Sequence, residues 1–169
     1  MHGYTPSAAA KAGHAAPDPS LTAVDSSGKT QLHHAAERGD ASEVARLLAA
    51  APQLACQPTK YAKETPLHLA AKGGHAAVAE LILAAAPQAA MVADYAGRLP
   101  AHVAAGRGHA DVLALLLQAA PAAARKYGRR GTTPLHCAAS NGHAAAIRVL
   151  LAADPGAARV DRDESLLPR

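Results

Sequence analysis

The residues of this chain best suited to chemistry are its histidines and cysteines. Ten histidines and two cysteines, Cys56 and Cys137, stand among the 169 residues. Imidazole and thiolate groups are common metal ligands, and a cysteine beside a histidine can act as a nucleophile. The cysteines form no Cys-x-x-Cys pair, and nothing in the sequence orients a histidine toward either of them. A phosphate-binding glycine loop, paired catalytic carboxylates and a serine nucleophile motif are also lacking.

The histidines recur at a regular spacing, which favours a structural role. His33, His68, His102 and His136 lie 35, 34 and 34 residues apart. The ligands of one metal ion must meet at a point, whereas these residues occur once in each unit of the chain. We therefore expect no catalytic, metal-binding or cofactor-binding residue, no cofactor and no enzyme activity.

Two other landmarks repeat in step with these histidines. A glycine follows each of them by six residues and a proline by 19. Self-similarity at this period indicates a solenoid, in which each unit packs against its neighbours. The interval from proline to the next histidine is 16 residues between the first two units and 15 between the later ones, so the first of these loops holds an extra residue. The landmarks are Gly39, Gly74, Gly108 and Gly142, and Pro52, Pro87, Pro121 and Pro155.

Local signals within each unit predict two helices. Thr65 and Thr133 are of a type that caps helix N-termini, and proline follows each at the first helical position. The first helix ends near a glycine. The second carries an apolar stripe, which is Val78, Leu81 and Ile82 in one unit. An Ala-x-Pro sequence follows, and its proline stops the helix.

Composition limits the core that the chain can build. Hydrophobic residues make up 50% of the sequence but aromatic residues only 2%. Thin layers of closely packed helices suit this composition better than one thick core. The formal net charge of +4 leans toward an acidic partner. The sparse cysteines favour a reducing setting, the cytoplasm or the nucleus, and no apolar run is long enough to span a membrane.

The string Thr-Pro-Leu-His-x-Ala-Ala followed by Gly-His resembles the ankyrin repeat, over about residues 25–164. The resemblance implies an all-α ankyrin-repeat solenoid, with antiparallel helix pairs and β-turn fingers between repeats. It also implies that the histidines hydrogen-bond between turns and adjacent repeats. The family usually closes its second helix with glycine, and the Ala-x-Pro ending is similar to that of plant and algal ankyrin proteins. In this register Cys137 is a small core residue, His34 is a partly buried edge residue, and Cys56 lies in an exposed loop.

The landmarks divide the chain into units. Residues 18–25 match the end of the last unit, and the final residues match the start of another, which predicts a fragment or truncated product of a longer array. The expected organisation is a disordered segment or degenerate repeat remnant at 1–27, repeats at 28–62, 63–96, 97–130 and 131–164, and the start of a truncated fifth repeat at 165–169.

The resemblance places partner-binding positions at the finger tips and at the exposed end of each first helix. Transferred position by position, this set is rich in basic side chains and contains two tyrosines in adjacent fingers. Tyrosine and arginine dominate binding hot spots, although charged residues are also ordinary in solvated loops. The wider set includes Glu37, Glu64, Gly106 and Ser140, and the predicted partner-binding residues are Lys29, Arg38, Tyr61, Lys72, Tyr95, Arg98, Arg107, Arg129, Arg130 and Asn141.

These observations favour a non-catalytic protein–protein interaction module that binds an acidic protein through its concave finger face, with no small-molecule substrate. The alternative is the ankyrin portion of a larger enzyme or membrane protein whose activity lies outside this chain. Nucleic-acid binding ranks last, because aromatic residues are few and no other nucleic-acid motif occurs.

Overall fold

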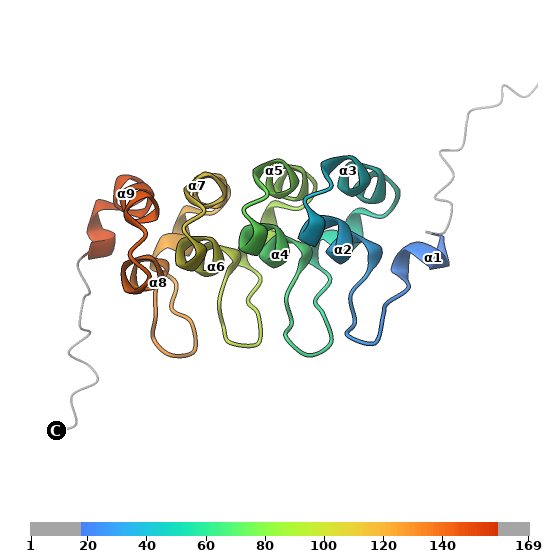
Figure 1. The fold of residues 1–169 in the computed structure, drawn as a ribbon, viewed down its shortest axis with the longest axis horizontal. Coiled ribbons are helices and arrows are strands. Elements are labelled where there is room, and N and C mark those ends of the chain that lie inside the picture. Colours follow the sequence, from blue (N-terminus) through green and yellow to red (C-terminus); the bar gives the residue numbers. More distant parts are fainter. Residues whose placement is uncertain (1–17, 159–169) are drawn as a thin grey trace, which may run out of the picture.

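The computed structural model describes residues 18–158 as four helix pairs stacked in a row (Figure 1). The inner helices are α2 (Gln31–Arg38), α4 (Pro66–Gly73), α6 (Pro100–Arg107) and α8 (Pro134–Ser140). The outer helices are α3 (Ala41–Ala50), α5 (Ala76–Ala85), α7 (Ala110–Ala119) and α9 (Ala144–Ala153). A four-residue helix, α1 (Pro19–Thr22), precedes them. The 3-10 helices η1 (Pro52–Cys56), η2 (Pro87–Met91), η3 (Pro121–Arg125) and η4 (Pro155–Ala158) follow the outer helices.

The helices form two layers, with each helix packed against its counterpart in the next pair. Four loops project from one side of the inner layer (Figure 1). The described residues contain no strand, and the predicted all-α solenoid is confirmed. The predictions for residues 1–17 and 165–169 fall outside the described residues, as does the last part of the fourth predicted repeat.

Each inner helix begins at a cap in which a histidine takes part. The backbone N–H of Thr65 donates to Nδ1 of His68 at 3.2 Å, and Thr30 and Thr133 make the same bond to the histidine three residues on. These bonds satisfy polar groups that a helix start leaves unpaired. The N-cap residue of the third inner helix is Leu99, which has no hydroxyl, yet its N–H still donates to Nδ1 of His102 at 3.1 Å. The cap therefore depends on the histidine more than on the threonine.

The Ala-x-Pro sequences end the outer helices, as expected, but they also begin new structure. Pro52 starts η1, and Leu54 within it is fully buried. Because this 3-10 turn folds back onto the core, Cys56 at its end is half-buried and packs against core residues. The prediction that Cys56 lies in an exposed loop is wrong. Cys137 is also half-buried against the core.

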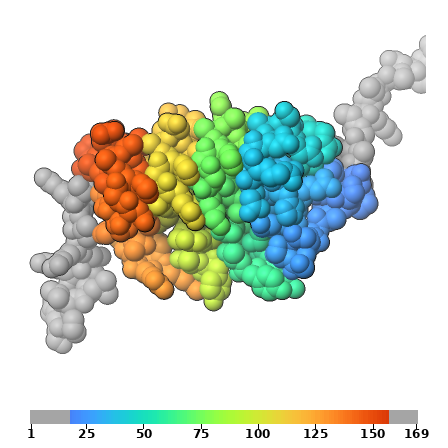
Figure 2. Space-filling view, in the orientation of Figure 1, coloured from blue at the N-terminus to red at the C-terminus, as the bar shows by residue number. Residues whose placement is uncertain are grey.

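Alanine allows the helix layers to approach closely. Ala35, Ala70 and Ala104 have no exposed surface, and the alanine that follows each of them is equally buried. The space-filling view shows neighbouring repeats in continuous contact (Figure 2). The core is a thin, continuous layer of small and medium-sized side chains, as the composition predicts.

Candidate functional site

The regular spacing of His33, His68 and His102 corresponds to one hydrogen-bonding role. Nδ1 of His68 accepts the N–H of Thr65, so the proton lies on Nε2, which donates to the carbonyl oxygen of Arg98 in the next repeat at 3.0 Å. Burial lowers the pKa of His68 below its usual range, which keeps the ring neutral. The same bond to the next repeat runs from His33 to Glu64 and from His102 to Thr132.

The histidines of the Gly-His landmarks bond in the opposite direction along the stack. Nε2 of His75 lies 3.1 Å from the carbonyl oxygen of Glu37 in the preceding repeat. Equivalent contacts join His109 to Lys72 and His143 to Gly106. The predicted structural role of both histidine sets is confirmed, since they join turns or adjacent repeats. Among the described residues, His136 makes only the cap with Thr133.

The described residues do not assemble the other chemistry that histidine and cysteine allow. Within residues 18–158, no three His, Cys, Asp or Glu side chains lie together as a metal site. Burial raises the pKa of both cysteine thiols, Cys56 and Cys137, which disfavours the nucleophilic thiolate.

Four fingers project beside one another at residues 25–29, 59–64, 94–98 and 128–132. Each is closed at its base by a backbone bond, such as that from the N–H of Asp94 to the carbonyl oxygen of Arg98 at 2.9 Å. Each also bonds to its neighbour. The N–H of Tyr95 donates to Ala62 at 2.8 Å, and the N–H of Arg129 donates to Ala96 at 3.0 Å. The fingers therefore form one connected row.

The hydrogen bonds identify the extra residue of the second finger. The backbone N–H of Lys60 donates to the first finger, as the backbone N–H of Tyr95 donates to the second. The carbonyl oxygen of Ala62 accepts from the third finger, as that of Ala96 accepts from the fourth. Lys63, with φ of 57°, takes the left-handed position that glycine holds in the other fingers. Tyr61 is therefore the inserted residue. Counting back seven residues from His68 and from His102 aligns Tyr61 with Tyr95, and this alignment is wrong by one position.

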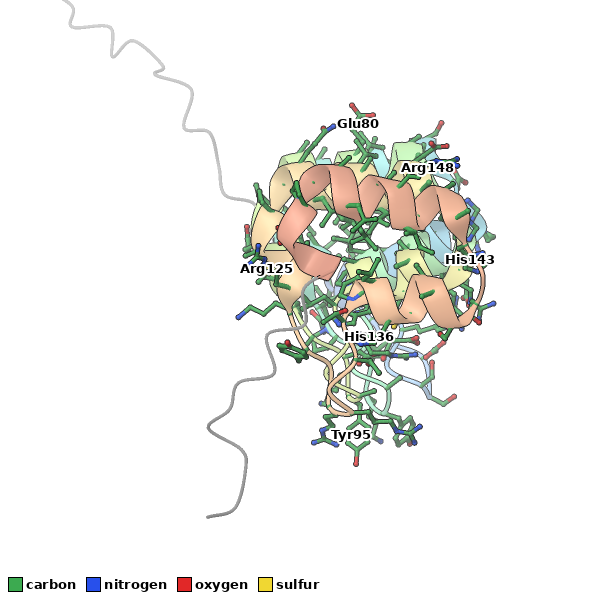
Figure 3. All side chains as sticks on the ribbon, turned by 90° about the vertical axis from the view of Figure 1, so that its left-hand side faces the viewer. Glu80, Tyr95, Arg125, His136, His143 and Arg148 are labelled. Carbon is green, nitrogen blue, oxygen red and sulfur yellow. The ribbon has the colours of Figure 1, made fainter. Side chains whose placement is uncertain are left out.

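Tyrosines and cations meet at the finger tips. The guanidinium of Arg129 lies 4.7 Å from the ring centre of Tyr95, and the ammonium of Lys60 lies 5.2 Å from that of Tyr61. Cation–π attraction acts at these distances. Tyr61 is 66% exposed and Tyr95 64%. Figure 3 shows Tyr95 at the finger end, opposite Glu80 and Arg148 on the outer helices.

Lys60 was not among the predicted binding residues. Lys60 lies next to a tyrosine in a finger, and this could have identified it from the sequence. The alignment of the second finger, wrong by one residue, gave the position of Lys60 to Tyr61. Backbone hydrogen bonds between fingers were needed to correct it.

Two of the predicted basic residues have partners inside the protein. Lys29 pairs with Glu37 at 2.8 Å, and Arg98 pairs with Asp94 at 2.8 Å. The side chain of Asp94 is 2% exposed, and its carboxylate also accepts the backbone N–H groups of Ala96 and Arg98, which stabilises the finger. These two cations contribute less to an outward positive field than the sequence suggests.

The structure brings four of the ten predicted residues to one place. Lys72, Arg98, Arg107 and Asn141 line a cavity of about 300 Å³ between the fingers and helices α4, α6 and α8. Lys29 and Arg38 lie at the other end of the stack, in the first repeat. Tyr61, Tyr95, Arg129 and Arg130 are exposed on the fingers.

None of the helices described in residues 18–158 has the length and hydrophobicity needed to cross a bilayer.

Comparison with known families gives a direct match to this architecture. A family model described as ankyrin repeats in three copies matches residues 8–90 and again residues 83–162. Comparison with curated proteins gave no match. With the helix pairs, the fingers and the bridging histidines in place, and with most of its length matched, the chain belongs to the ankyrin-repeat family.

Proposed function

We propose that this chain is a non-catalytic adaptor that holds a partner protein across its fingers and inner helices. Ankyrin repeats are a general protein–protein interaction module. The observation that carries the proposal is the stacked pair of Tyr95 and Arg129 at the finger tips. Large exposed side chains held by a rigid scaffold lose little conformational entropy on binding, which suits them as contact residues.

The proposed partner carries an acidic surface. Lys72, Arg107 and Arg130 are exposed, and no carboxylate lies within ion-pair distance of them among the described residues. Such cations increase the association rate and the specificity for a negatively charged surface. The half-buried, unpaired thiols fit an assignment to the cytoplasm or nucleus.

Affinity capture from source cells tests this function. The wild-type chain is compared with the double variant Arg129→Glu/Arg130→Glu and with Arg148→Glu. Arg148 lies on outer helix α9, away from the fingers (Figure 3), so Arg148→Glu controls for a charge reversal outside the fingers. The double variant is expected to lose the captured proteins and Arg148→Glu to retain them. Equal capture by all three chains, each shown to be helical by circular dichroism, would contradict the proposal.

A further inference from the structure

The cavity lined by Lys72, Arg98, Arg107 and Asn141 also borders a glycine of one inner helix, which leaves space there. Gly106 lies four residues after His102, at the position that Glu37, Lys72 and Ser140 occupy in the other repeats. The absence of a side chain there leaves a hollow between α6 and α8, bordered by Cys137 and Asn141.

The backbone does not require glycine at this position. A Cβ atom on Gly106 would lie 3.5 Å from Cβ of Cys137 and 3.9 Å from Nδ2 of Asn141, which are ordinary contacts. Gly106 lies within α6, with no left-handed φ. Glycine inside a helix is a poorer choice than alanine by about 1 kcal/mol. The fold therefore accepts a less favourable helix residue at a position where a side chain would occupy space in the hollow.

The floor of the hollow is held in place. The carbonyl oxygen of Gly106 lies 3.1 Å from Nε2 of His143 in the next repeat. On the far wall, Asn141 donates through Nδ2 to the carbonyl oxygen of Cys137 at 2.8 Å. A partner side chain would enter a preformed site, which reduces the entropy cost of binding.

The walls carry a small excess of positive charge. Lys72, Arg98 and Arg107 are cationic, and Glu64 is anionic. Arg98 is already paired with the buried carboxylate of Asp94. Three positive and two negative charges leave an excess of one, which matches a single carboxylate better than a dianionic phosphate.

We propose that the hollow over Gly106 receives an aspartate or glutamate side chain from an extended segment of the partner protein. The exposed cations Lys72 and Arg107, which line the cavity, attract the carboxylate, and Gly106 provides the space. This inference rests on the proposed function and adds the chemistry and position of one contact.

Selection of short random peptides on the full chain tests the contact. Peptides that bind in the hollow over Gly106 are expected to share one acidic residue. Synthetic peptides with that residue changed to its amide, Glu to Gln or Asp to Asn, are expected to bind at least about tenfold more weakly.

Two variants locate the contact. Gly106→Ala is expected to weaken binding of the acidic peptides about tenfold while raising the thermal midpoint of the protein, which separates lost binding from lost folding. The double variant Lys72→Glu/Arg107→Glu is expected to select peptides with a basic residue at the same position. Arg148→Glu, a charge reversal on the outer layer, is expected to bind as the wild type does.

The outcomes distinguish this inference from the function on which it rests. Peptides that lose binding in Arg129→Glu/Arg130→Glu but show no acidic preference, or bind Gly106→Ala unchanged, would overturn the pocket and leave the adaptor role standing. Failure to select any peptide that responds to either double variant would overturn both.

Discussion

A single histidine side chain links two repeats at once. His68 accepts the N–H of Thr65 through Nδ1 and donates through Nε2 to Arg98 in the next finger, and it is 1% exposed. His136 makes the same cap with Thr133, but it is exposed, and within residues 18–158 its Nε2 has no carbonyl partner. These two histidines, each preceded by Thr-Pro-Leu, therefore differ in what their loss would cost.

The substitutions His68→Ala and His136→Ala test this difference. His68→Ala is expected to lower the free energy of unfolding by about 3 kcal/mol, because it leaves a cavity and two unpaired backbone groups. His136→Ala is expected to cost about 1 kcal/mol, because it loses only the cap. Urea denaturation followed by circular dichroism measures both. Equal losses would show that the bond to the next repeat contributes little.

At the scale of the element, a finger depends on one residue in the left-handed region. Glycine fills that position in three fingers, as at Gly97 with φ of 71°. In the second finger Lys63 fills it with φ of 57°. Such a conformation is unfavourable for a residue with a Cβ atom. The inserted Tyr61 thus extends a finger that already carries backbone strain, and it increases the exposed aromatic surface.

Lys63→Gly is expected to stabilise the protein by about 0.5–1 kcal/mol, because it relieves this strain. The reverse kind of change, Gly97→Ala, is expected to destabilise it by more, since the new Cβ atom would lie 2.9 Å from the backbone nitrogen of Arg129. Thermal unfolding of both variants gives the comparison. A lower midpoint for Lys63→Gly would show that the lysine side chain makes a stabilising contact in the finger.

At the scale of the whole molecule, stability comes from contacts between neighbouring repeats, and three buried histidines lie in those contacts. Burial lowers the pKa values of His33, His68 and His102 below their ordinary 6.5. The unfolded chain therefore binds protons that the folded chain excludes. The part of the free energy of unfolding that is linked to these histidines is fully present above about pH 6.5. It is lost as the pH falls below that value toward the folded-state pKa values.

The free energy of unfolding is accordingly expected to be flat above about pH 7 and to fall toward pH 5.5, by up to about 1.4 kcal/mol per pH unit for each of the three histidines. Urea denaturation across this range measures the slope, and most carboxylates remain ionised throughout it. His68→Ala is expected to reduce the slope. A slope that His68→Ala leaves unchanged would mean that other groups titrate.

The repeat architecture was predictable because its determinants are local. The cap at Thr65, the proline after it and the histidine at the helix start lie within four residues of one another, and the histidine returns in each of the four units. Local signals of this kind need no knowledge of distant contacts. Ala35 and Ala70, which occupy the same position in their repeats, are both fully buried.

The sequence by itself determined the repeat and its helices, because each repeat folds on similar local signals and packs only on its neighbours. The bridging role of the histidines came from the resemblance to the ankyrin repeat. The tertiary structure alone decided what depends on position in the stack. Spacing counts an extra residue in the second finger but cannot identify it, whereas hydrogen bonds between fingers single out Tyr61. The 3-10 turn, and not a loop, buries Cys56. The missing side chain of Gly106 leaves a hollow only because α8 brings Cys137 and Asn141 beside it, and no local sequence pattern encodes that approach.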